Sequence, residues 1–154
     1  MKHFILLTII ALGFISSQQP SPSTEEMDIL MNNWHKAAAE ANGDFYFGLM
    51  DESFVFLGTD PNERWNKEAF MAFCKPHFEK GKGWDFKTIE RHWSFSKDKK
   101  TAWFDEKIDT WMKDCRGSGV MIKKGKEWYL TQYNLAVLIE NEKIQSFIEL
   151  REKE

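Results

Sequence analysis

The chain has 154 residues and a formal net charge of −3, from 21 Lys and Arg against 24 Asp and Glu that are interspersed along it. This balance does not favour a nucleic-acid partner, because such proteins present a basic patch or stripe. The length fits one domain with a single core. Thirteen Phe and seven Trp supply core area, and such side chains also line small-molecule pockets.

The first twenty residues have the pattern of a targeting segment. Lys2 and His3 precede an apolar run from Phe4 to Ile15, and small and polar residues follow abruptly. The run is shorter than the roughly 20 residues that a membrane-spanning helix needs, so an uncleaved anchor is the weaker alternative. We therefore expect a signal peptide at 1–19, a flexible leader at 20–25 and one folded domain at 26–152. The protein should be periplasmic or extracellular, without stable membrane insertion.

Two cysteines follow the targeting segment, Cys74 and Cys115. They could pair in an oxidising compartment, and the alternative is two buried thiols. Neither has a partner at metal-ligand spacing, so no metal site is predicted. The chain also carries no Gly-rich phosphate loop and no nucleophile elbow, and we expect no cofactor.

Helical periodicity opens the folded part. Between residues 25 and 42, apolar side chains recur at intervals of three and four, which predicts an amphipathic helix with Thr24 as its cap. His35 lies beside this apolar stripe. Such a histidine is more typical of a hydrogen-bonded boundary residue than of a catalyst. Asp44 is expected to cap a short second helix that ends at Met50.

The stretch from Phe54 to Trp65 predicts a strand, a turn and a helix entry. Four apolar residues, Phe54 to Leu57, are typical of a strand that is covered on both faces, and Gly58 with Asp60-Pro61 ends it. Asn66 can cap the next helix, which we expect to reach Lys80 with a kink or restart at Pro76. Trp65 then precedes the cap and should lie at a cavity mouth.

Four strand candidates follow, separated by Lys-, Asp- and Gly-bearing turns, and successive hairpins predict an antiparallel sheet. They are Trp84–Ser96, Thr101–Thr110, Arg116–Lys124 and Glu127–Ile139. A last amphipathic segment, Asn141 to Glu152, can be a helix or a strand, and a helix is slightly favoured.

This order of elements resembles the cone-shaped α+β fold shared by nuclear transport factor two, ketosteroid isomerase, scytalone dehydratase and the SnoaL-like proteins. The sequence is most similar to the SnoaL-like branch, and nearly all of the chain after residue 25 takes part. The motifs that carry the resemblance are Gly43-Asp44 with Asp51-Glu52, Phe56-Leu57-Gly58-Thr59-Asp60-Pro61, Glu63-Arg64-Trp65, Ala102-Trp103-Phe104, Arg116-Gly117-Ser118-Gly119-Val120 and Trp128-x-Leu130-x-Gln132-Tyr133-Asn134. Asn66 departs from the pattern, since many relatives have Gly there.

The resemblance implies N-terminal helices packed on a curved antiparallel sheet, a mostly apolar cavity inside the cone, and often a homodimer. It does not imply catalysis, because one fold hosts many functions. The residues expected to line the pocket are Trp34, Phe56, Trp65, Trp103, Met121, Gln132 and Asn134.

Asp105 is the candidate for a buried carboxylate, because strand alternation places it on the same face as Trp103. A carboxylate against aromatic surface has a raised pKa, as a general base near neutral pH requires. His92 on the preceding strand could share a proton with it, and a polar pair on a solvated face is the favoured alternative.

The leading hypothesis is an exported module without a cofactor that binds a small apolar or amphipathic molecule in the cone. The first alternative is a lyase or isomerase that uses Asp105 and His92. The second is a homodimeric interaction domain without catalysis, whose outer sheet face would present Tyr129, Tyr133, Leu135 and Val137.

Overall fold

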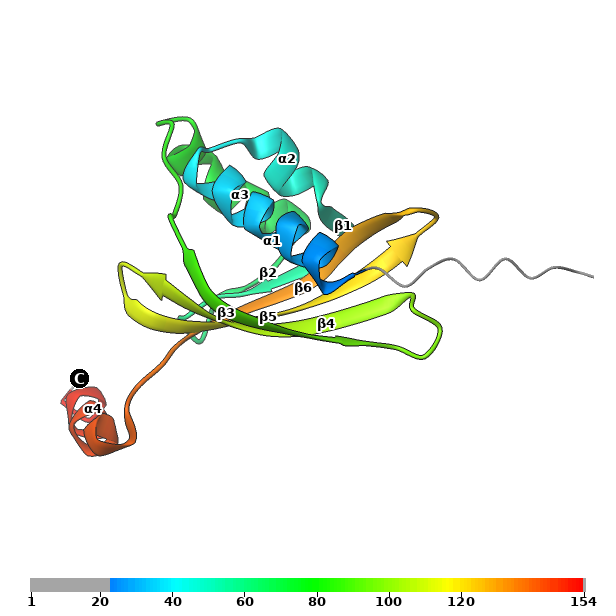
Figure 1. Cartoon of the computed structure of the whole chain (residues 1–154). Coiled ribbons are helices and arrows are strands. Elements are labelled where there is room, and N and C mark those ends of the chain that lie inside the picture. The colour runs from blue at the N-terminus through cyan, green and yellow to red at the C-terminus, as the bar shows by residue number, and fades with distance from the viewer. Residues whose placement is uncertain (1–22, 154) are drawn as a thin grey trace, which may run out of the picture.

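The computed structural model describes residues 23–153, in which the helices of the first half of the chain pack on one face of a curved sheet (Figure 1). The predicted signal peptide and the first residues of the predicted leader lie outside the described residues, so export stays a prediction. Thr24 and Glu25, which that prediction placed in the leader, belong to the first helix. No helix between residues 23 and 153 is long and apolar enough to cross a membrane.

The sheet has six strands in the order β2-β1-β6-β5-β4-β3, and all neighbours are antiparallel except β1 and β6, which are parallel. The strands are β1 (Met50–Leu57), β2 (Arg64–Asn66), β3 (Lys87–Phe95), β4 (Thr101–Thr110), β5 (Lys113–Lys124) and β6 (Glu127–Val137). The helices are α1 (Thr24–Ala39), α2 (Gly43–Gly48), α3 (Lys67–Phe78), the short 3-10 helix η1 (Asn141–Lys143) and α4 (Ile144–Arg151). The predicted α+β architecture is confirmed, while the short strand β2 was not predicted.

Local capping chemistry explains where the helices begin. Ser23, one residue before the predicted cap, starts α1 with a reciprocal pair of hydrogen bonds to Glu26. Asn42 caps α2 instead of Asp44, because its side chain accepts from the backbone N–H of Phe45 at 3.2 Å. Asn66 caps α3 as predicted. That helix continues through Pro76 to Phe78, so it does not restart and it ends before Lys80.

A β-bulge in β6 changes which side chains face the helices. Val120 pairs with Gln132 while Met121 pairs with Leu130, so Thr131 is an extra residue opposite β5. Simple alternation would put Leu130 and Gln132 on one face. Because of the insertion, Leu130 is fully buried and Gln132 is exposed on the outer face.

Aromatic side chains fill the space between helices and sheet. Trp34 of α1 stacks on Tyr46 of α2 with ring centroids 4.7 Å apart, and both are almost completely buried. Tyr133 of β6 packs against Trp34 from the sheet side. The deep part of the cone is therefore a solid core.

Cys74 and Cys115 are both buried and are free thiols, which corresponds to the second of the two alternatives for this pair, two buried thiols.

Candidate functional site

A pocket of about 150 Å³ opens where the β1–β2 loop, α3, the segment before β3 and the β4–β5 turn meet. Seven of its twelve lining residues are aromatic, so its walls are mainly ring surface. The lining residues of this mouth pocket are Phe56, Gly58, Thr59, Glu63, Trp65, Phe70, Phe73, Trp84, Phe86, Trp111, Met112 and Leu135. An apolar concavity with a few polar groups is the usual form of a small-molecule site.

Strand pairing and helix capping position the rings on one side of the pocket. Phe56 of β1 pairs with Trp65 of β2 across the sheet and stacks on Phe70 of α3 at 4.1 Å. Trp65 directly precedes the cap Asn66 and contacts Phe70, which is the arrangement of a hydrophobic staple. Trp65 also stacks on Phe73, with centroids 4.6 Å apart. Its ring is therefore fixed from two directions.

The pocket reaches solvent and carries a polar group at its rim. Trp111 in the β4–β5 turn is 81% exposed and Phe73 is 43% exposed, so both rings border the opening. The Glu63 carboxylate accepts a hydrogen bond from the backbone N–H of Asp60 at 3.2 Å, which holds it in the loop. A carboxylate in this place can accept a further hydrogen bond from the hydroxyl or N–H of a bound ring.

A buried polar network centres on Glu106 of β4, which has no exposed surface. One carboxylate oxygen accepts hydrogen bonds from His35 at 2.8 Å and from the Tyr133 hydroxyl at 2.7 Å. The other oxygen accepts two from the Arg91 guanidinium, at 2.7 and 3.0 Å. Arg91 also contacts Asp28 of α1 at 3.0 Å, so the network joins the helix to the sheet.

Burial would by itself raise the pKa of Glu106, but the charges and hydrogen bonds of His35, Arg91 and Tyr133 together lower it to about 2. The carboxylate is therefore ionised at neutral pH. Burial and the Glu106 charge raise the pKa of Tyr133 well above its ordinary value, so that hydroxyl keeps its proton. Glu106 does not line the mouth pocket, and its lone pairs are occupied by donors. Its arrangement is that of a structural ion-pair network.

Asp105 and His92 lie directly opposite each other in the β3–β4 register. The expectation that Asp105 is buried against Trp103 is wrong, because both side chains are exposed on the outer face of the sheet. His92 is also exposed, and its nearest carboxylate is that of Glu90 at 3.9 Å. Neither side chain has the buried surroundings on which the proposed catalytic role was based, so the structure does not support that role.

The predicted pocket residues fall into three groups. Phe56 and Trp65 line the mouth pocket. Trp34 and Met121 are buried in the core and line no part of it. Trp103, Gln132 and Asn134 face outward, so the expectation that they line the cavity is wrong. Gln132 and Asn134 face outward because the bulge at Thr131 reverses the alternation along β6.

Two further sequence interpretations meet the structure here. Tyr133 and Leu135 point inward and are buried, so the outer surface predicted for dimerisation is wrong for these two residues. A homodimer remains a prediction. Gly117 is closely packed against protein, since an added Cβ would clash with the Tyr133 hydroxyl.

Most of the aromatic wall of the pocket was not predicted from the sequence, namely Phe70, Phe73, Trp84, Phe86 and Trp111, and neither was Met112. Trp111 could have been recognised from the sequence. A large ring in a tight turn between two strands is not expected to pack in the core, which suggests another role. The Glu106 network was missed as well. The sequence sign of this network was an acidic residue at an alternate position of β4, on the same face as Ala102, Phe104 and Ile108, which are buried.

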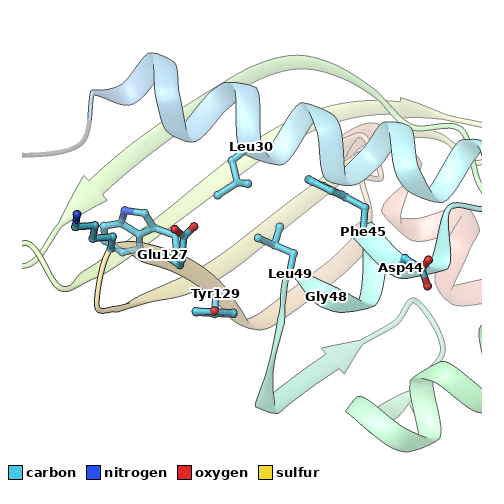
Figure 2. Close-up of a pocket in the computed structure, with 9 residues that line it drawn as sticks. Leu30, Asp44, Phe45, Gly48, Leu49, Glu127 and Tyr129 are labelled. Carbon is cyan, nitrogen blue, oxygen red and sulfur yellow. The ribbon is translucent and has the colours of Figure 1, made fainter.

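A second pocket, of about 360 Å³, lies at the other end of β5, between α1, α2 and the β5–β6 turn (Figure 2). We call it the helix–hairpin pocket. In Figure 2, Leu30 projects from α1 and Leu49 from the turn between α2 and β1 into the same gap. Asp44, Lys126 and Glu127 place charges on its lining. It lacks the stacked rings of the mouth pocket. No group of three or more potential metal ligands occurs within residues 23–153.

Helices on the concave face of a six-stranded sheet define a cone-shaped protein of the NTF2-like class, and solved structures agree. An NTF2-like protein from Pseudomonas putida matches with a TM-score of 0.62 at 12% identity, over 77% of this chain and 88% of that one. A proposed ketosteroid isomerase from Parabacteroides distasonis matches with a TM-score of 0.60 at 12% identity, over 74% and 86%. The association domain of C. elegans CaMKII matches with a TM-score of 0.60 at 12% identity, over 73% and 94%. At these identities the likeness shows the fold alone.

The family itself is shown by sequence. The family model of the SnoaL-like domain matches residues 28–140, and the chain belongs to this family. No curated protein matches the chain. Family and fold are compatible with small-molecule binding or with isomerase or lyase chemistry.

Proposed function

We propose that this protein binds a small ring compound in the mouth pocket. The observation that carries the proposal is a pocket of about 150 Å³ that opens to solvent and has seven aromatic side chains in its lining. An apolar cavity of about this volume in another protein stays dry and binds benzene. The ligand class is therefore one aromatic ring with a small polar substituent, such as phenol or indole. The substituent would donate a hydrogen bond to Glu63 at the rim.

Acid-base catalysis has less support. Asp105 and His92 are exposed, and Glu106 is ionised with its oxygens already paired. The deep cone is filled by Trp34, Tyr46 and Tyr133, so a ligand of steroid size would have to displace the core. Binding without chemistry is the function that these side chains favour.

The test is calorimetric titration of the protein with phenol and indole, with a steroid as the oversized control. We expect saturable binding of the two ring compounds, a ligand-dependent rise in thermal stability, and no binding of the steroid. Failure of both ring compounds to bind at millimolar concentration would overturn the proposal.

Two tryptophan variants locate the site. Trp65→Ala should weaken binding by roughly 3- to 10-fold, since a stacked aromatic pair contributes about 0.5–1.5 kcal/mol. Its own unfolding free energy should fall by only about 1–2 kcal/mol, because the ring is half-buried. Trp103→Ala is the matched control: this Trp is 46% exposed on the outer face, and its loss should leave affinity unchanged. Equal losses in the two variants would place the ligand elsewhere.

A further inference from the structure

The C-terminal helix α4 stands away from the rest of the molecule and makes its packing contacts with η1 (Figure 1). Every residue from Asn141 to Lys153 is exposed. Ile144, Phe147 and Ile148 form an apolar stripe with i, i+3 and i+4 spacing. A helix this short is not stable alone in water. Its stripe therefore needs a partner surface, and the family match ends at residue 140, before the helix begins.

The chain leaves the sheet at the rim of the mouth pocket. Leu135 near the end of β6 lines that pocket. The backbone N–H of Leu138 still donates to the carbonyl of Asp114 at 3.0 Å, so the chain is held to β5 up to this point. The β4–β5 turn with Trp111, another rim residue, lies just before Asp114. Only Ile139 and Glu140 then separate the sheet from η1.

This tether is long enough for α4 to reach the pocket. Two extended residues span about 7 Å. The helical segment from Asn141 to Phe147 adds about 10 Å. The strand path from Leu138 back to Leu135 is about 10 Å. Rotation at Ile139 and Glu140 is therefore sufficient to carry Phe147 over the opening.

We propose that α4 folds back over the mouth pocket of its own chain, with the Phe147 ring in the pocket and Ile144 and Ile148 against Trp111 and Phe73. The pocket's volume of about 150 Å³ matches a single six-membered ring, which is what Phe147 carries. The rim residues Trp111 and Phe73 are exposed without α4, as are the three side chains that would cover them. Where small rings bind this pocket, as in the proposed function, Phe147 competes with them as an internal plug.

Paramagnetic relaxation tests the docking without any ligand. A spin label on Ser146→Cys lies on the polar side of α4, and burial of Cys74 and Cys115 should protect the two native thiols from the labelling reagent. We expect strong broadening of the Trp111 indole N–H signal and none of the Trp103 signal. Adding Phe147→Ser to the labelled protein should restore the Trp111 signal.

Each other outcome overturns the proposal. An unbroadened Trp111 signal means that α4 does not dock at the mouth, and a broadened Trp103 signal means that it docks on the outer face. A further sample mixes spin-labelled protein that carries no ¹⁵N with ¹⁵N protein that carries no spin label. Broadening in that mixture means that the pocket receives α4 from a second copy.

Competition is a separate readout. In the unlabelled protein, Phe147→Ala should tighten binding of phenol or indole about twofold or more, because the competing occupant is removed. Unchanged or weaker binding contradicts a plug. If neither the unlabelled wild-type protein nor Phe147→Ala binds phenol or indole while the Trp111 signal of the spin-labelled protein is broadened, the proposed function fails and the docking of α4 stands.

Discussion

At the scale of single residues, one position separates the carboxylate that sequence reasoning selected from the one that matters to the structure. Asp105 and Glu106 are neighbours on β4, and alternation correctly places them on opposite faces. Which face is buried could not be deduced, because Trp103 lies on the outer face and made it look like the core side. His35 was expected to be a hydrogen-bonded boundary residue; it is hydrogen-bonded, but it is buried, with 4% of its surface exposed. Its partner, 71 positions away, is set only by the tertiary fold.

The Glu106 network should control stability and its pH dependence. Glu106→Gln leaves the Arg91 guanidinium, only 2% exposed, without its buried counter-charge. We expect a loss of about 3 kcal/mol at pH 7, the lower end of the range for breaking a buried ion pair. Urea unfolding measures it. Asp105→Asn, the exposed neighbour, is the control and should change stability by less than about 0.5 kcal/mol.

The pH dependence of folding stability follows from the lowered pKa of Glu106. The pKa of Glu106 is lowered from 4.5 to about 2 on folding, so the unfolded chain binds more protons between these values. Stability from this group is complete above about pH 4.5 and is lost as the pH falls through about 2. The Gln variant should lack this part of the acid sensitivity. A variant with wild-type stability and an unchanged acid profile would show that the network is not structural.

At the scale of elements, the sequence was informative wherever local chemistry decides. The four long strands, the α3 cap and the amphipathic α1 follow from periodicity and capping residues. The faces of β6 did not follow, because a bulge at Thr131 depends on pairing with β5 and leaves no pattern in β6 alone. Gln132 and Asn134 were therefore assigned to the wrong side. The same limit applies to β2, whose three residues are ordered by pairing with β1.

Gly117 shows how tightly β5 packs on the Glu106 network. Gly117→Ala would push its Cβ to 2.2 Å from the Tyr133 hydroxyl oxygen and 2.8 Å from a Glu106 oxygen. We expect a loss of about 2–4 kcal/mol in the unfolding free energy, from overpacking and a weakened charged hydrogen bond. Gly48→Ala is the control, because nothing lies within 4 Å of its added Cβ. Denaturant midpoints at equal slope would compare them. Equal stability of the two variants would mean that the β5 backbone yields easily.

At the scale of the whole molecule, the order of helices and strands was enough to identify the cone. The free volume inside it was not predictable, because volume is the small difference between the space a sheet encloses and the side chains that fill it. Here Trp34, Tyr46 and Tyr133 fill the depth, and the mouth pocket stays open to solvent. The docking of α4 that we propose would depend on contacts between distant segments, which composition and periodicity do not encode.

The most direct test of the central claim is a crystal structure of the protein soaked with indole or phenol. We expect ring density between Phe56, Trp65 and Trp84, with the polar substituent toward Glu63. Density confined to the helix–hairpin pocket, or an empty mouth pocket at a ligand concentration that saturates binding in solution, would contradict it.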